Sequence, residues 1–180
     1  RAFTSTTVAQ VKWQPTYKVT VNPGTDGIVK YKINDGEYKI CEKFFYFDVG
    51  QTAYLKAEPN AGFRFLKWSN ENTSDEIRIT ERTEISANWM KTYNVSIQND
   101  TGGSVVFNGE ASATTTKTFD AGSNVIINVS ADQGYRLKTV TVNGTAATVV
   151  EGKLTIENLQ TDTRVAASWQ KTFTVTVNPG

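Results

Sequence analysis

The feature that most constrains this chain is a tryptophan-ended segment that recurs at a nearly constant spacing. Trp13, Trp89 and Trp169 each end a short run of apolar and polar residues, and they are separated by 76 and 80 residues. After two intervening residues, each is followed by a second shared segment; the three copies of it are residues 16–21, 92–97 and 172–177. A repeat of this length predicts a tandem array of small structural units.

Further landmarks keep their order inside the repeat. Phe47-Asp48-Val49-Gly50 matches Phe119-Asp120-Ala121-Gly122, and Ala61-Gly62-Phe63-Arg64-Phe65 matches Gln133-Gly134-Tyr135-Arg136-Leu137. This register divides the chain into four parts: residues 1–15 are the C-terminal tail of a preceding repeat, 16–91 a first complete β repeat, 92–171 a second complete β repeat, and 172–180 the first strand of a following repeat. We therefore expect the chain to be a segment of a longer array.

The residue types in each repeat favour β-strands. Thr, Val and Ile together supply 54 residues, whereas Leu supplies only 5. β-branched side chains lose rotamer freedom in a helix and pack well on a pleated sheet. Tyr17, Val19 and Val21 alternate with polar residues, and Asp35-Gly36, Asn108-Gly109 and Asn143-Gly144 are pairs typical of hairpin turns. The sequence predicts an all-β protein with two tandem small domains of about six strands each.

The ordered set of these motifs resembles the divergent internalin B-repeat family, which is close to the Listeria–Bacteroides repeat. The resemblance is carried by the Tyr17–Gly24 strand and turn, Asp48-Val49-Gly50, the Gly62–Trp68 segment, and the strand that ends at Trp89. It covers two full and two partial copies, with Val140 in the second copy where the first has Trp68. Because the internalin B-repeat itself has a ubiquitin-like fold, the resemblance leaves two architectures open: a β-sandwich-like domain or a helix-poor β-grasp variant.

The same resemblance implies a secreted or cell-surface bacterial protein, so an extracellular location is expected. It favours a non-catalytic structural and interaction module, such as a stalk or adhesin segment. The alternative is an accessory module that holds substrate for a secreted enzyme whose catalytic domain lies outside this segment. The expected partners are neighbouring repeats of the same chain and a protein or glycan ligand.

Several other function classes lack the residues that they need. The chain has no histidine, and Cys41 is its only cysteine, so we expect a small, buried or half-buried strand residue there and not a nucleophile. The carboxylates do not show the spacing of a metal site, and no phosphate-binding glycine loop is present. We therefore expect no enzyme activity, no cofactor and no metal. The 19 basic and 18 acidic residues form no basic stripe, which argues against nucleic acid, and no apolar run suits membrane insertion.

One candidate binding site remains, at the aromatic run Phe44-Phe45-Tyr46-Phe47. The second repeat has Thr116-Lys117-Thr118-Phe119 at the matching positions. Because side chains alternate along a strand, Phe45 and Phe47 should face inward while Phe44 and Tyr46 face the other way. Two interpretations follow: Phe44 and Tyr46 form an exposed contact patch that the fold does not need, or the longer 30–45 segment of the first repeat covers them.

Overall fold

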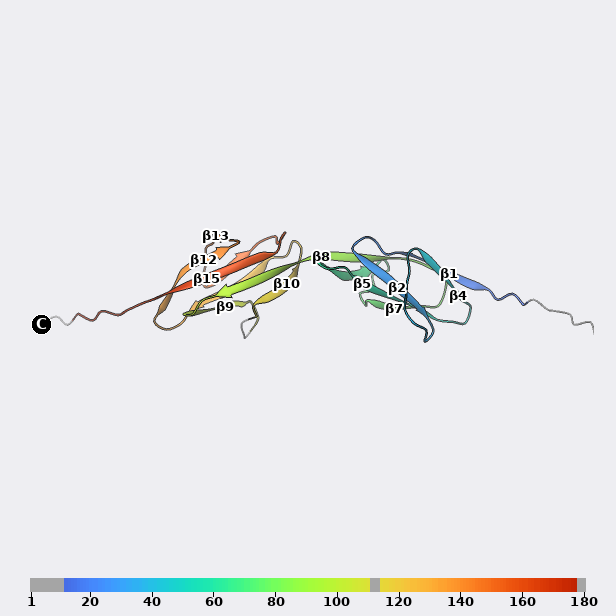
Figure 1. Ribbon diagram of the computed structural model, residues 1–180, viewed down its shortest axis with the longest axis horizontal. Coiled ribbons are helices and arrows are strands. Elements are labelled where there is room, and N and C mark those ends of the chain that lie inside the picture. The colour runs from blue at the N-terminus through green and yellow to red at the C-terminus, as the bar shows by residue number, and fades with distance from the viewer. Residues whose placement is uncertain (1–11, 111–113, 178–180) are drawn as a thin grey trace, which may run out of the picture. The chain divides into compact units, whose positions relative to one another are not determined.

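The computed structural model describes residues 12–110 and 114–177 of the 180-residue chain, and the described residues form strands and connecting turns without a helix (Figure 1). The strands are β1 (Thr16–Asn22), β2 (Gly27–Ile33), β3 (Lys39–Ile40), β4 (Phe44–Asp48), β5 (Ala53–Pro59), β6 (Phe63–Trp68), β7 (Glu76–Ile79), β8 (Thr83–Asn99), β9 (Gly103–Phe107), β10 (Thr116–Asp120), β11 (Val125–Ala131), β12 (Tyr135–Val142), β13 (Thr145–Ala146), β14 (Lys153–Ile156) and β15 (Thr163–Lys171). The all-β prediction is confirmed.

The chain divides into two compact units, residues 1–89 and 90–180. The division falls within β8, which is one continuous strand from Thr83 to Asn99. The first part of β8 pairs with β1 in the first unit, and its last part pairs with β10 and β15 in the second. Counting β8 in both, the described residues of each unit form seven strands of four or more residues and one two-residue strand, compared with the six or so that were predicted.

The first unit consists of two sheets. In one sheet β1 lies between β4, with which it is antiparallel, and the first part of β8, with which it is parallel; β6 pairs with the other side of β8. The other sheet has the order β3-β2-β5-β7. β1 thus joins segments that are far apart in the sequence, since Val19 pairs with both Phe45 and Thr83.

The second unit repeats this arrangement. Its larger sheet has the last part of β8 between the antiparallel β10 and the parallel β15, with β12 and β13 beyond β15. Its smaller sheet has the order β14-β11-β9. The two-residue strands β3 and β13 have no counterpart in the described residues of the other unit; they lie in segments where one repeat is longer than the other.

Within residues 12–110 and 114–177, each unit has one hydrophobic core to which both of its sheets contribute. In the first unit, Val19 and Phe45 come from one sheet, and Val29 and Leu55 from the other. In the second unit, Val95 and Val165 face Val105 and Ile127 in the same way. Two sheets that share one core form a β-sandwich, and the face that a helix would cover in a β-grasp fold is covered here by the second sheet. The β-sandwich alternative is therefore the architecture observed.

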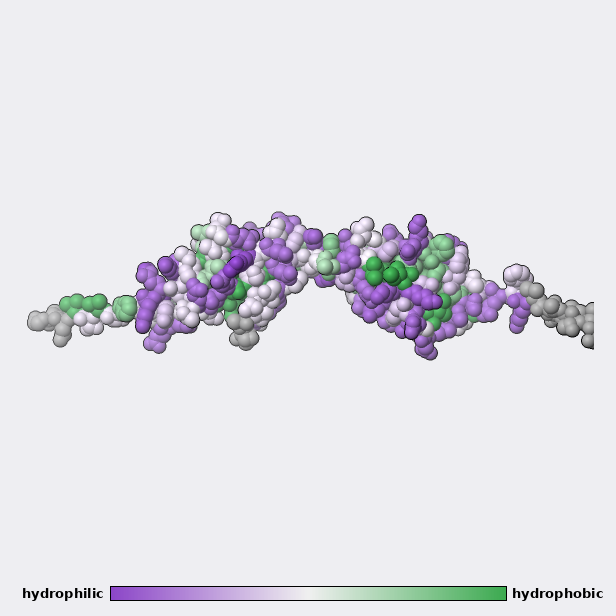
Figure 2. Space-filling model, viewed as in Figure 1, coloured by the Kyte–Doolittle hydropathy of each residue, from purple (hydrophilic) through white to green (hydrophobic). Residues whose placement is uncertain are grey.

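The segments at the two ends of the described chain are outside these sandwiches. Residues 12–15 and 172–177 form no strand, and Trp13, Phe173, Val175 and Val177 are each at least 80% exposed. Figure 2 shows the apolar residues of the C-terminal segment as hydrophobic surface. The rest of the predicted flanking segments, residues 1–11 and 178–180, lies outside the described residues.

Candidate contact surface

Phe44 and Tyr46 lie on the outer face of β4 and are exposed. Their exposed fractions are 52% and 53%, whereas Phe45 and Phe47 are 5% and 2% exposed. The predicted alternation along this strand is confirmed. The interpretation that the longer 30–45 segment covers Phe44 and Tyr46 is wrong, because that segment forms part of the β2–β3 hairpin in the opposite sheet and does not extend over the outer face of β4.

The two exposed rings contact each other edge to face. Their centroids are 5.7 Å apart and their planes make an angle of 77°. The ammonium group of Lys18, on the neighbouring strand β1, lies 4.7 Å from the centroid of the Phe44 ring. Lys18 pairs with Tyr46 across the two strands, which places all three side chains on one face of the sheet. This surface therefore combines two aromatic rings with one cation.

The inward-facing rings of β4 hold the strand against the core. Phe45 stacks on Tyr31 of the other sheet, with centroids 4.0 Å apart and planes within 12° of each other. Phe47 contacts Tyr17 of β1 at a centroid distance of 5.6 Å. Because these contacts anchor β4 from its inner face, Phe44 and Tyr46 are not needed to hold the strand in place.

The second unit provides an internal comparison for each of these positions. The pairing of β10 with β8 places Thr116, Lys117 and Thr118 where β4 has Phe44, Phe45 and Tyr46. Thr116 and Thr118 are exposed. Lys117 forms an ion pair with Glu110 at 2.6 Å, and this interaction lowers the pKa of the Glu110 carboxyl group. The same fold therefore forms in the second unit without the exposed aromatic pair.

Ile40 extends the apolar surface beside β4 and was missed by the sequence analysis. It is 61% exposed and lies between two shallow hollows on the first unit. One hollow, of about 340 Å³, is lined by Tyr31, Ile40, Glu42, Lys43 and Phe44; the other, of about 260 Å³, has Ile28, Ile40 and Cys41 among its lining residues. A two-residue strand such as β3 has too little alternation to reveal from the sequence which way Ile40 faces.

Cys41 lies directly after β3, between the two sheets, and is 2% exposed. Its burial is as predicted, although it is not within a strand. Burial raises the pKa of the thiol to about 11, so the thiol is protonated at neutral pH. Cys41 is therefore a core residue and lacks the properties of a nucleophile.

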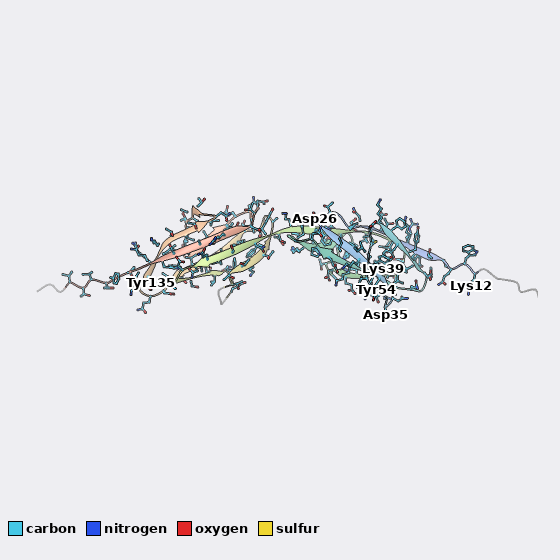
Figure 3. All side chains as sticks on the ribbon, in the orientation of Figure 1. Lys12, Asp26, Asp35, Lys39, Tyr54 and Tyr135 are labelled. Atoms are coloured by element: carbon cyan, nitrogen blue, oxygen red, sulfur yellow. The ribbon has the colours of Figure 1, made fainter. Side chains whose placement is uncertain are left out.

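A cluster of lysine and tyrosine side chains lies on the other sheet of the first unit. The Lys32 ammonium is 4.8 Å from the centroid of the Tyr38 ring and 5.0 Å from that of Tyr54, a residue labelled in Figure 3. Burial, together with the neighbouring Glu76 carboxylate, raises the pKa of Tyr38 to about 12. Lys32 and Tyr54 are a cross-strand pair, and Tyr38, in the connection between β2 and β3, contacts the same ammonium group, so the cluster is explained by the fold.

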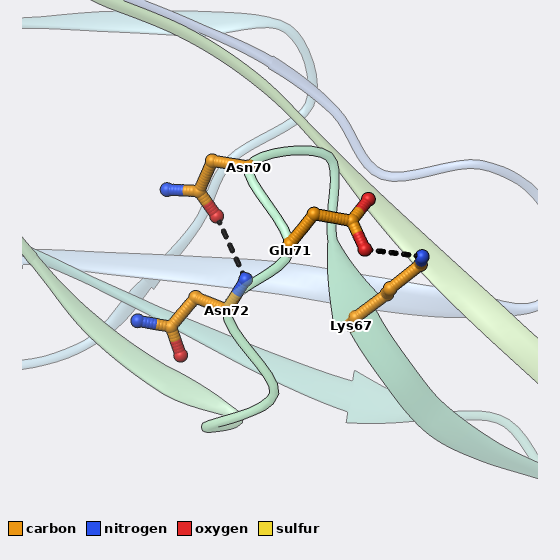
Figure 4. A network of polar contacts seen from close by, with 4 residues as sticks. All are labelled: Lys67, Asn70, Glu71 and Asn72. Carbon is orange, nitrogen blue, oxygen red and sulfur yellow. Dashed lines mark hydrogen bonds and ion pairs between the residues drawn. The ribbon is translucent and has the colours of Figure 1, made fainter.

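Another polar network closes the turn that follows β6 (Figure 4). Lys67 forms an ion pair with Glu71 at 2.6 Å, and the Asn72 amide donates a hydrogen bond to the side-chain oxygen of Asn70 at 3.2 Å. Glu71, whose N–H closes the turn by donating to the Trp68 carbonyl, has a φ angle of 67°, in the left-handed region that residues other than glycine seldom adopt. Across residues 12–110 and 114–177, no three His, Cys, Asp or Glu side chains gather in a way that could hold a metal ion.

Trp68, the most prominent residue of the shared Gly62–Trp68 motif, is a core residue. It is fully buried, and its indole N–H donates a hydrogen bond to the Ser74 carbonyl at 2.8 Å. Val140 takes its place in the second unit and is 4% exposed. The difference between the repeats at this position is therefore a difference in core packing.

The fold and its repeated strand order define a protein built from tandem β-sandwich repeats. The sequence model of the family described as the divergent InlB B-repeat domain matches the chain twice, over residues 17–92 and 93–173. The chain belongs to this family, as its sequence motifs indicated. The two matches show that the chain consists of tandem repeat domains.

Other comparisons add little to this assignment. No match was found among the curated proteins. A mutant of the major pilin of Streptococcus pyogenes is 10% identical over 89% of this chain and 99% of the pilin, with a TM-score of 0.26, which is too low to support an inference. The part of the chain that the structure describes includes no helix with the length and apolar character needed to cross a membrane.

Proposed function

We propose that this chain is a non-catalytic structural and interaction segment, a stalk or adhesin module, of a secreted or cell-surface bacterial protein. We further propose that Phe44 and Tyr46 form its contact site for a protein or glycan ligand. The family to which the chain belongs supports the structural role. Neighbouring repeats of the same chain are the other partners that we propose.

One observation favours a contact site: the exposed aromatic pair is present in only one of two units with the same strand order. Phe44 and Tyr46 are both more than half exposed, and Thr116 and Thr118 occupy their positions in the second unit. Exposed aromatic side chains contribute strongly to binding when a partner covers them. An aromatic pair that the fold does not require is therefore best explained by a contact with another molecule.

The test is a binding assay with the whole chain. Fluorescently labelled chain would be applied to an array of extracellular-matrix and plasma proteins and to a glycan array. We expect a ligand on one of these arrays to bind the chain, and the Phe44→Thr/Tyr46→Thr variant to lose at least about tenfold in affinity, since buried aromatic contacts each contribute about 1 kcal/mol or more.

Two controls accompany this assay. The double variant should keep the thermal stability of the parent chain, because threonine occupies both positions in the second unit. The Thr116→Ala/Thr118→Ala variant should bind as the parent does. Equal binding by the parent chain and by the Phe44→Thr/Tyr46→Thr variant to every ligand found would rule out this contact site.

A further inference from the structure

The two residues that expose aromatic rings also have unpaired backbone groups at the edge of a sheet. β4 pairs with β1 on one side, and no other strand of the described chain pairs with its second side. The Val21 amide donates to the Lys43 carbonyl, and the Val49 amide donates to the Pro15 carbonyl. Because backbone direction alternates along a strand, residues 43, 45, 47 and 49 face β1, and Phe44, Tyr46 and Asp48 face the open edge.

Asp48 differs from the other two residues at this edge, because its amide donates to the side-chain oxygen of Gln51 at 2.9 Å. The open part of the edge is therefore formed by Phe44 and Tyr46, each with one N–H and one C=O group. Their side chains are on the outer face of the same strand. An added strand could form up to four backbone hydrogen bonds here and place alternate side chains beside the two exposed rings.

Open edges are usually protected against pairing with other chains, and this edge lacks the usual protection. Charged residues within an edge strand, inward-facing charges in particular, discourage pairing. β3, β6 and β7, the other edge strands of this unit, each contain lysine or arginine, whereas β4 has four consecutive aromatic residues before Asp48. In the second unit the equivalent edge strand, β10, has the inward-facing Lys117 where β4 has Phe45. Both β4 and β10 pair with a strand on one side only, but β4 alone of the two has an apolar side chain at this inward-facing position.

The geometry of the rings favours a peptide over a sugar as the occupant. A sugar ring packs flat against an open aromatic face. Here the Lys18 ammonium covers one face of Phe44, and Phe44 and Tyr46 meet edge to face at 77° and so offer no common flat surface. Apolar side chains of a strand, in contrast, can pack beside rings in any of these orientations.

We propose that the open edge of β4 binds an extended segment of another protein as an added β-strand. The segment forms hydrogen bonds with the backbone of Phe44 and Tyr46, and its alternate apolar side chains contact the two rings. This inference rests on the proposed function, because it names the kind of partner that the same contact site accepts.

The probe is a synthetic peptide with a suitable alternating pattern, Lys-Thr-Phe-Thr-Val-Thr-Val, identical to residues 171–177 of the chain. A matched peptide carries N-methyl groups at alternate residues, so it has the same side chains but cannot donate hydrogen bonds along one edge. We expect the first peptide to bind with a dissociation constant below about 1 mM and to slow amide exchange at Phe44 and Tyr46. The N-methylated peptide should bind at least about tenfold more weakly.

Two protein variants separate the backbone of the edge from its side chains. Tyr46→Pro removes the outward-facing N–H, while Tyr46→Thr removes the ring and keeps that N–H; proline is tolerated where the missing donor faces away from the neighbouring strand. We expect Tyr46→Pro to bind the peptide about tenfold more weakly than Tyr46→Thr. Circular dichroism and thermal unfolding would establish that both variants fold.

The outcomes separate this inference from the proposed function. Equal binding of both peptides, or no binding at about 1 mM, would overturn strand addition, even if the Phe44→Thr/Tyr46→Thr variant still lost its ligand on the arrays. If the peptide slows amide exchange at Phe44 and Tyr46 of the parent chain, and the Phe44→Thr/Tyr46→Thr variant binds it with the same affinity, strand addition is supported and the contact with the two rings is ruled out. Concentration-dependent dimerisation that Tyr46→Pro abolishes, without peptide binding, would identify a second copy as the occupant and overturn the proposal.

Discussion

At the scale of single residues, two of the three tryptophans that mark the repeat, Trp89 and Trp169, are explained by the glycines beneath them. The Trp89 ring lies on Gly27, where a Cβ atom would be 2.4 Å from the indole, and its N–H donates to the Pro23 carbonyl at 2.7 Å. Trp169 lies on Gly103 in the same way, at the same distance. A recurring tryptophan at the end of the closing strand therefore requires a recurring glycine at the start of the second strand.

Replacing Gly27 with alanine tests this contact. The new methyl group would overlap the Trp89 ring, so Gly27→Ala should lower the free energy of unfolding of the first unit by about 1–3 kcal/mol, as overpacked cores do. Urea unfolding of the parent chain and the variant would measure the loss. In a Trp89→Leu background the same substitution should cost less than about 1 kcal/mol, because the clashing ring is gone. An equal cost in both backgrounds would contradict the packing explanation.

At the scale of elements, the three turn pairs chosen from the sequence have different structures. Asn143-Gly144 joins β12 to β13, and both residues have positive φ angles, 51° and 81°, as a type I′ hairpin turn requires. After β2, the residue with positive φ is Asn34, at 51°, and not Gly36. Asn108-Gly109 follows β9, from which the chain continues to β10 in the other sheet, so this pair forms no hairpin. The same residue pair therefore forms different connections according to the partners of its strands.

The hairpin at Asn143-Gly144 allows a test of backbone strain without a change in packing. No atom lies within 4 Å of a Cβ built at Gly144, so the cost of Gly144→Ala comes from its φ angle alone. We expect this variant to lower the free energy of unfolding of the second unit by about 1–2 kcal/mol. Gly144→Asn should recover part of that loss, since asparagine tolerates left-handed backbone better than alanine. Chemical denaturation would measure both variants, and equal losses would argue against strain.

At the scale of the whole molecule, the two units have separate cores, and Trp68 is the largest side chain that is fully buried in either of them. Trp68 is buried in the first core and Val140 takes its place in the second. The two repeats thus fill the same position with different volumes. Each core must be packed by its own neighbouring side chains, and a substitution in one core should act on that unit.

Trp68→Val gives the first unit the residue that the second unit has at the matching position, and it tests whether the two cores are independent. The smaller side chain leaves a cavity and removes the hydrogen bond to Ser74, so the first unit should lose about 3–5 kcal/mol. Hydrogen exchange followed by mass spectrometry should then show faster exchange in core peptides within residues 16–88 and unchanged exchange within 92–171. Faster exchange in both sets of peptides would indicate one cooperative core. Val140→Ala, as the matched control, should affect only the second set.

Features that depend on neighbouring residues could be predicted from the sequence alone. The all-β class and the orientation of residues 44–47 follow from alternation and turn residues, which act within a few positions of the chain. The repeat register follows from motifs that recur along the sequence. The inward and outward sides of β4 were therefore predicted correctly before any strand was paired. The turn at Asn143-Gly144 could also be identified, because its positive φ angles suit asparagine and glycine.

The tertiary structure alone decided which strands became neighbours. The pairing of β1 with β8 joins residues more than 60 positions apart. The alternation of apolar and polar residues along β1 cannot specify this pairing, because it would be the same whichever strand lay beside β1. Because β1 lies between β8 and β4, β4 is the edge strand of its sheet and the backbone of Phe44 and Tyr46 is open. The pairing of β3 with β2 places residues 39–40 in the opposite sheet, where they cannot cover the two rings. Exposure of the candidate site is thus a consequence of sheet order, which is determined by long-range packing of the core.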